Sequence, residues 1–165
     1  MGLDHTKPAP GPSPAGLTMG PFRVNAAGAL EPIEPDAVPG FTCRWRDRKV
    51  HARVLPGEPS DWRLLLQAPI ARMPSSVRAP DATRRPPGFA LLRELPATLP
   101  EGWRIGLAAD HRVLLEVACR VPLPITATSL IGEVTMFFLR LAPYLDVLEE
   151  AGLNAPPVGA GTANT

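Results

Sequence analysis

The sequence has few cysteines and no long apolar segment without charge. Its 165 residues include 2 cysteines, Cys43 and Cys119, which are too few for a disulfide framework. We expect both to be buried free thiols of a cytoplasmic protein. The most apolar segment, 123–148, contains charged residues and therefore does not predict a membrane span. The polar, proline-rich N-terminus does not resemble a signal peptide.

Motifs for catalysis and metal binding are missing as well. The histidines (His5, His51 and His111) form no H-x-x-x-H pair, and the cysteines form no C-x-x-C pair. The serines at 75–76 lack the glycines of a nucleophile elbow, and no glycine-rich phosphate loop follows a predicted strand. Adjacent carboxylates occur only at 149–150, on an expected solvated helix end. The sequence predicts no metal site and no cofactor, and an enzyme of unknown class is the least favoured function.

Prolines concentrate at the ends of the chain and in its connections, and the sequence contains 22 of them. In residues 1–21 they are interspersed with glycine, a composition that buries too little apolar surface to fold. The segment 154–165 has the same character. We therefore predict disordered tails at 1–21 and 154–165, and a single α+β domain over 22–153. A short strand is predicted at its start, over residues 22–24.

Two alternating segments predict a β-hairpin at the start of this domain. Every second residue is apolar from Phe41 to Trp45 and again from Val50 to Val54, which places these side chains on one face. A tight turn near residues 47–48 would join the two strands. The residues on the opposite, outer face are mostly basic and include Arg44, Arg46, Lys49, His51 and Arg53.

Further elements complete an antiparallel sheet of about five strands, two hairpins plus one strand. Pro69 is expected to end or bend the third strand, or to mark an edge. Pro96 is expected to stop a short helix. In chain order the elements are a strand at 62–68, a short middle helix at 89–95, a hairpin at 103–121 and a long C-terminal helix at 127–151.

The long helix is predicted to cover the sheet, because no other segment is long enough to do so. Thr126 or Thr128 can cap its start, and Gly152 can cap its end. Pro143 lies inside it and predicts a kink or a break.

The same helix carries a broad apolar stripe. Most of the stripe is expected in the core, but the adjacent Phe137 and Phe138 cannot both point directly inward. We therefore predict a homodimer contact through Phe137, Phe138 and Tyr144.

Charge is distributed unevenly although the net charge is only +1. The middle of the chain is basic and the part after Val121 is acidic. A long loop at 74–87 adds further cations next to the first hairpin, and loops of this length are often functional or disordered. Its arginines are Arg78, Arg84 and Arg85.

The segment from Asp110 to Ala151, a strand that ends in Val-Pro-Leu-Pro before the long helix, has a familiar outline. Together with the order hairpin, strand, short helix, hairpin and helix, it resembles the C-terminal half of the type III secretion chaperone-like superfamily, which includes the YbjN group. The resemblance covers residues 41–151 and implies a chaperone-like fold that binds another protein. It carries no functional motif, so it assigns no site residue.

These observations favour a non-enzymatic, cytoplasmic bacterial protein that binds a protein partner, as a chaperone or adaptor. The outer face of the first hairpin and the loop 74–87 form the expected binding surface. The alternative is an anion-binding or nucleic-acid-binding module that uses the same basic residues. Nucleic acid is less favoured, because Phe41 and Trp45 fall on the opposite face and leave no exposed aromatic for base stacking.

Overall fold

The computed structural model describes residues 17–57, 62–73 and 87–154. They form an α+β fold, as the sequence predicts. The predicted tails lie outside the described residues at 1–16 and 155–165, whereas residues 17–21 contain the first strand. The strands are β1 (Thr18–Met19), β2 (Phe22–Val24), β3 (Leu30–Pro32), β4 (Gly40–Trp45), β5 (Arg48–Leu55), β6 (Arg63–Arg72), β7 (Trp103–Leu107) and β8 (Arg112–Arg120), and the helices are α1 (Pro87–Thr98) and α2 (Ala127–Glu150).

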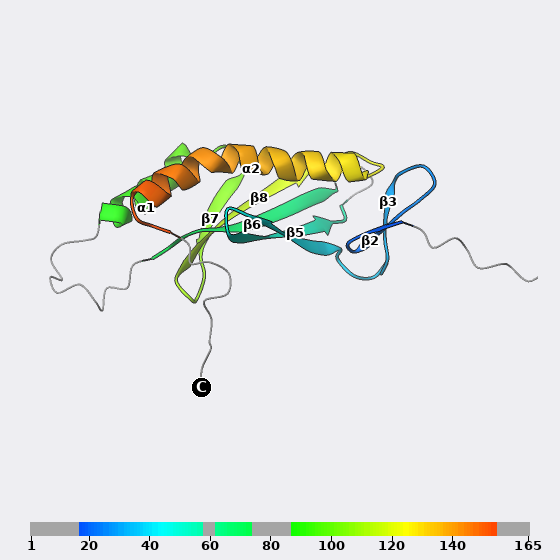
Figure 1. Cartoon of the computed structure of the whole chain (residues 1–165), viewed down its shortest axis with the longest axis horizontal. Coiled ribbons are helices and arrows are strands. Elements are labelled where there is room, and N and C mark those ends of the chain that lie inside the picture. The colour runs from blue at the N-terminus through cyan, green and yellow to red at the C-terminus, as the bar shows by residue number, and fades with distance from the viewer. Residues whose placement is uncertain (1–16, 58–61, 74–86, 155–165) are drawn as a thin grey trace, which may run out of the picture.

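A five-stranded antiparallel sheet in the order β4-β5-β6-β8-β7 forms the centre of the fold. It contains both predicted hairpins and the strand between them. Helix α2 lies along one face of the sheet, and no helix of the described residues covers the other face (Figure 1). Antiparallel sheets commonly have one packed and one solvated face. We call the side opposite α2 the outer sheet face.

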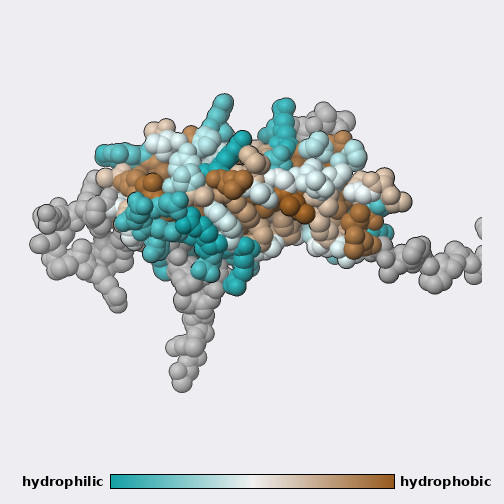
Figure 2. Space-filling view, turned by 45° about the horizontal axis from the view of Figure 1, so that its top comes forward, coloured by the Kyte–Doolittle hydropathy of each residue, from teal (hydrophilic) through white to brown (hydrophobic). Residues whose placement is uncertain are grey.

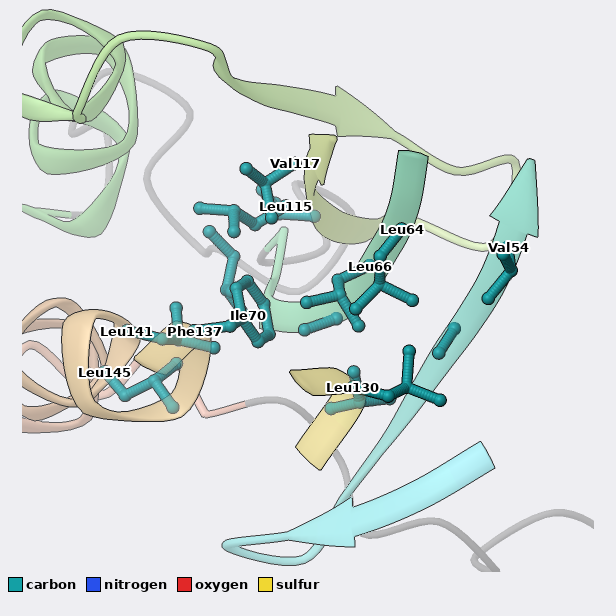
Figure 3. Packing of buried hydrophobic residues seen from close by; sticks show 14 of the residues in the cluster. Val54, Leu64, Leu66, Ile70, Leu115, Val117, Leu130, Phe137, Leu141 and Leu145 are labelled. Carbon is teal, nitrogen blue, oxygen red and sulfur yellow. The ribbon is translucent and has the colours of Figure 1, made fainter. Parts of the chain in front are cut away.

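The hydrophobic core lies between the sheet and α2. Strand register aligns the inward side chains in rows, so that Ala52 lies opposite Leu66 and Leu66 lies opposite Val117. In Figure 3 the labelled side chains of the strands and of α2 point toward one another across this layer. The buried residues of α2 are Leu130, Phe137, Leu141, Leu145 and Leu148.

Pro69 lies inside strand β6 instead of ending it. β6 pairs with β5 only up to Gln67, whereas its pairing with β8 continues to Arg72. At Pro69, β6 is therefore paired with β8 but not with β5. On the unpaired side the missing N–H of proline interrupts no hydrogen bonds between strands. The register shifts between Pro69 and Ala71. The expected bend and local edge thus coincide with this irregularity, and the strand extends beyond the predicted 62–68.

Helix α2 starts at a capping box. Oγ1 of Thr126 accepts a hydrogen bond from the backbone N–H of Ser129 at 3.1 Å, and Oγ of Ser129 accepts one from the backbone N–H of Thr126 at 3.0 Å. The cap is therefore Thr126, one of the two predicted positions. The helix then continues through Pro143 without a break. Pro143 and Leu139, whose carbonyl loses the bond, both lie on the exposed side, where water can replace the missing donor.

The end of α2 confirms the predicted glycine cap and joins the two helices. Gly152 has φ +73°, and the next residue, Leu153, donates its N–H to the carbonyl of Leu148 at 2.9 Å. The Leu153 side chain is 3% exposed and packs against α1. A Cβ atom at Gly88 would lie 2.5 Å from Cδ2 of Leu153, so any larger residue there would force the buried Leu153 side chain to shift.

Helix α1 is longer than the predicted 89–95, and Pro96 does not stop it. Pro96 cannot donate a hydrogen bond to the carbonyl of Leu92, and the helix continues for only two more residues, to Thr98. Oγ1 of Thr98 donates to the carbonyl of Leu95 at 2.9 Å and closes that turn.

A three-stranded sheet, β1-β2-β3, lies beside the start of α2 and includes the predicted strand at Phe22 (Figure 1). The backbone N–H of Leu30 donates to the carbonyl of Ile125 at 2.7 Å, which ties this sheet to the segment before the helix. Phe22 and Leu30 are buried in the common core. The sequence did not predict β1 and β3.

Candidate functional site

The outer sheet face is the most strongly charged surface of the five-stranded sheet. Alternation along each strand and the cross-strand register together identify its residues. Its basic side chains are exposed and come from all five strands. The basic ones are Arg44 on β4, Lys49, His51 and Arg53 on β5, Arg63 and Arg72 on β6, Arg104 on β7, and Arg112 and Arg120 on β8.

Several of these cations lie directly opposite one another. Arg44 pairs with Lys49, Arg63 pairs with Arg120, and Arg72 pairs with Arg112. Like charges at directly opposite positions destabilise a sheet. Arg44, Arg63 and Arg120 also take part in other interactions within the chain. The unusual property of this face is therefore the sign and density of its charge.

The acidic residue at an outward strand position of this face is Glu116 on β8. It lies opposite Arg104 on one side and Gln67 on the other, and Nε2 of Gln67 donates to it at 3.4 Å. At the edge of the face, Asp110 in the turn before β8 forms an ion pair with Arg112. Basic residues thus greatly outnumber acidic ones here.

His51 lies in the centre of the basic part of this face. Burial lowers its pKa below 6.5, and the positive charges of Lys49, Arg112 and Arg53 lower it further. The imidazole is therefore neutral at neutral pH and carries a proton only in more acidic solution. His51, Lys49, Arg53 and Arg44 lie on the outer face as the sequence predicts.

Arg46 does not lie on the outer face, contrary to the sequence prediction. It occupies the β4–β5 turn, where both Arg46 and Asp47 have positive φ (47° and 59°). From there it turns toward α2 and donates to Asp146 at 2.6 Å and to Glu149 at 3.2 Å. Its guanidinium also lies 5.7 Å from the ring centroid of Trp45. Arg46 therefore connects the hairpin to the helix.

Arg48, which the sequence placed in the turn, is the buried member of the same cluster. Its side chain is 7% exposed and forms an ion pair with Glu149 at 2.7 Å. Nη1 donates to the carbonyl of Arg46 at 3.0 Å, while Nε has no hydrogen-bond partner among the described residues. Glu149 is therefore a paired, partly buried carboxylate and not a solvated one.

The aromatic residues predicted to form a dimer contact are used within the chain. Phe137 is 3% exposed and belongs to the core, so the structure contradicts its assignment to a dimer surface. Phe138 stacks on Trp45 with ring centroids 4.8 Å apart. Tyr144 lies beside Trp103 and donates its hydroxyl to the carbonyl of Thr98 at 2.9 Å.

The solvent-facing side of α2 carries other apolar residues. Figure 2, which is turned toward the helix side of the molecule, shows apolar side chains scattered among polar ones there. Those on α2 are Ile131, Met136, Leu139 and Val147.

Aromatic residues of the five-stranded sheet face inward. Phe41, Trp45 and Trp103 share the face that packs against α2, as register and ring contacts show. No Phe, Tyr or Trp side chain of the described strands β4 to β8 is therefore on the outer sheet face.

The cysteines are half-buried and unpaired, not fully buried as expected. Burial raises the pKa of both thiols, and at Cys119 the charge of Glu133 raises it further while Arg140 opposes this. Raised thiol pKa values reduce the thiolate population and hence nucleophilicity. Within the described ranges, no three His, Cys, Asp or Glu side chains gather as metal ligands would.

Neither described helix has the length and apolar character needed to cross a membrane. The predicted partner-binding residues Arg78, Arg84 and Arg85 lie outside the described residues.

No family model matches the chain, and no curated protein matches it significantly. The functional conclusion therefore depends on the geometry and charge of the outer sheet face.

Proposed function

We propose that this chain is a cytoplasmic bacterial protein-interaction module, a chaperone or adaptor without catalytic activity, whose outer sheet face binds an acidic part of a protein partner. The observation that carries the proposal is the juxtaposition of like charges on a face that no described helix covers. The pairs Arg44–Lys49, Arg63–Arg120 and Arg72–Arg112 all belong to this face.

Solvation alone gives no reason to place cations opposite one another. Like charges directly opposite one another are unfavourable in a sheet, and here they persist although Arg44, Arg63, Arg112 and Arg120 also have other interactions within the chain. Negative charges on a partner would relieve the repulsion between these cations. Binding would be stronger for this reason, because complementary charges stabilise a complex and speed its formation. Prevention of edge-to-edge aggregation does not explain Arg63, which is paired on both sides, with Leu55 of β5 and with Arg120 of β8.

A protein partner is favoured over a nucleic acid by the position of the aromatic residues. Sequence-tolerant binding of single strands combines a basic groove with exposed aromatic rings on which bases stack. In strands β4 to β8 the rings of Phe41, Trp45 and Trp103 face the core instead. The element order that resembles the type III secretion chaperone-like superfamily also supports a protein partner. The proposal does not require a homodimer.

The test is direct binding of labelled anionic polymers to the full chain over a salt series. We expect a poly-glutamate peptide to bind at low salt. The double substitution K49E/R53E should weaken this binding about tenfold, because it replaces two attractions by two repulsions. The matched control is R93E, a charge reversal at an exposed position of α1, which should leave binding unchanged.

Two results would overturn the proposal. The first is the absence of poly-glutamate binding at low salt. The second is tighter binding of an oligonucleotide of equal charge with a steep loss of affinity as salt rises, which would favour the nucleic-acid alternative.

A further inference from the structure

Strand β5 presents three outer-face side chains in a single row. Lys49, His51 and Arg53 alternate with buried apolar residues, so they point to the same side. Side chains two residues apart on a strand are separated by about 7 Å. An extended peptide with an acidic residue at every second position repeats its carboxylates at the same spacing. The row on β5 therefore matches such a peptide lying along the strand.

His51 is the middle member of this row, and groups on four strands surround it. On β5 itself the flanking residues are Lys49 and Arg53. On β4, Thr42 lies directly opposite and Arg44 is the next outward residue. On the other side Gln67 of β6 lies directly opposite, and beyond it β8 contributes Glu116 and Arg112. The surroundings of His51 are thus mainly cationic.

We infer that Lys49, His51 and Arg53 bind an extended acidic peptide segment with carboxylates at alternate residues, and that His51 makes this binding stronger as the pH falls. The inference rests on the proposed function, because it assigns a geometry and a pH response to the same face.

The direction of the pH effect follows from proton linkage. In the unbound chain, burial and the neighbouring cations hold the pKa of His51 below 6.5. A carboxylate placed against the imidazole favours its charged form and raises this pKa. Between the two pKa values the complex holds more protons than the unbound protein, so affinity rises as the pH falls through that range. Glutamate side chains stay mostly ionised above about pH 5.

The experiment compares two synthetic peptides of equal composition by titration against the full chain. In one peptide glutamate alternates with threonine, and in the other the glutamates are consecutive. We expect the alternating peptide to bind more tightly. Its affinity should increase about two- to fivefold between about pH 7.5 and about pH 5.5, the effect of one additional exposed charge pair.

Two variants identify the proton that is taken up. H51Q should abolish the pH response whatever its effect on the affinity at about pH 7.5, because glutamine does not titrate. H111N is the matched control, because His111 has φ 66° in the β7–β8 turn and asparagine tolerates that conformation. It should keep the response. The NMR titration of the His51 ring should show a pKa that rises when the alternating peptide is bound.

The outcomes separate the two proposals. Equal binding of both peptides, or a pH response that persists in H51Q, would overturn this inference and leave the proposed function intact. Failure of both peptides to bind at low salt would overturn both proposals.

Discussion

Nη2 of Arg48 lies 2.7 Å from Oε1 of Glu149, although Arg48 begins β5 and Glu149 lies in the last turn of α2. The arginine side chain is 7% exposed and points into the layer between sheet and helix. A charge in this position must be compensated, because water does not solvate it fully. The acidic end of α2 is therefore part of the packing between the hairpin and the helix.

The substitution E149Q should lower the free energy of unfolding by about 1–3 kcal/mol, because it leaves the buried Arg48 charge without its partner. Urea-induced unfolding measures the change. The neighbouring E150Q is the control, and it should change stability by less than about 0.5 kcal/mol since Glu150 is exposed. The double variant R48M/E149Q should be more stable than E149Q alone. Equal stability of the double and the single variant would show that the Arg48 charge is not what the glutamate stabilises.

Two glycines in helices should respond in opposite directions to alanine. G88A should destabilise the fold by about 1–3 kcal/mol, because its Cβ would lie 2.5 Å from Cδ2 of the buried Leu153. G132A should stabilise it by about 0.5–1 kcal/mol, since nothing lies within 4 Å of a Cβ there and alanine favours the helix. Thermal unfolding of both variants measures this contrast. Stabilisation by G88A would mean that Leu153 does not pack against α1 as described.

Two arginines of the outer sheet face should also differ in their effect on stability. Arg72 lies opposite Arg112, so R72T should stabilise the chain by about 0.2–1 kcal/mol by removing a like-charge pair. Arg104 lies opposite Glu116, so R104T should destabilise it by a similar amount. Denaturant midpoints at low salt should show the difference, and added salt should reduce it. A difference that does not depend on salt would contradict an electrostatic origin.

The strands and the long helix could be predicted because their apolar spacing records which side is buried. The same alternation also predicts the inward position of Arg48. Val50, Ala52 and Val54 are inward, and Arg48 belongs to the same alternation, which requires a two-residue turn at Arg46–Asp47. Placing the turn one residue later moved Arg48 out of the sheet. The inward position could thus have been deduced, whereas the glutamate that compensates the charge depends on how α2 packs.

Strands β1 and β3 of the small sheet were missed because proline and glycine obscure any alternation in strands of two or three residues. A local signal was present in the segment from Asn25 to Gly28. Oδ1 of Asn25 accepts from the backbone N–H of Ala27 at 3.0 Å, and Gly28 has φ +79°, as a tight connection between strands requires.

The outer-face residues of β6, β7 and β8 were missed for another reason. Their proximity to the first hairpin follows from the strand order, which the sequence does not state.

The pairing of the β4–β5 turn with the end of α2 spans 103 residues from Arg46 to Glu149. During synthesis from the N-terminus, the sheet strands therefore emerge well before the helix that covers them. Until then their inward leucines and valines and the Arg48 guanidinium face solvent. A nascent chain of this protein should be most prone to aggregation after β8 has emerged and before α2 has, which is the stage at which chaperone protection would matter most.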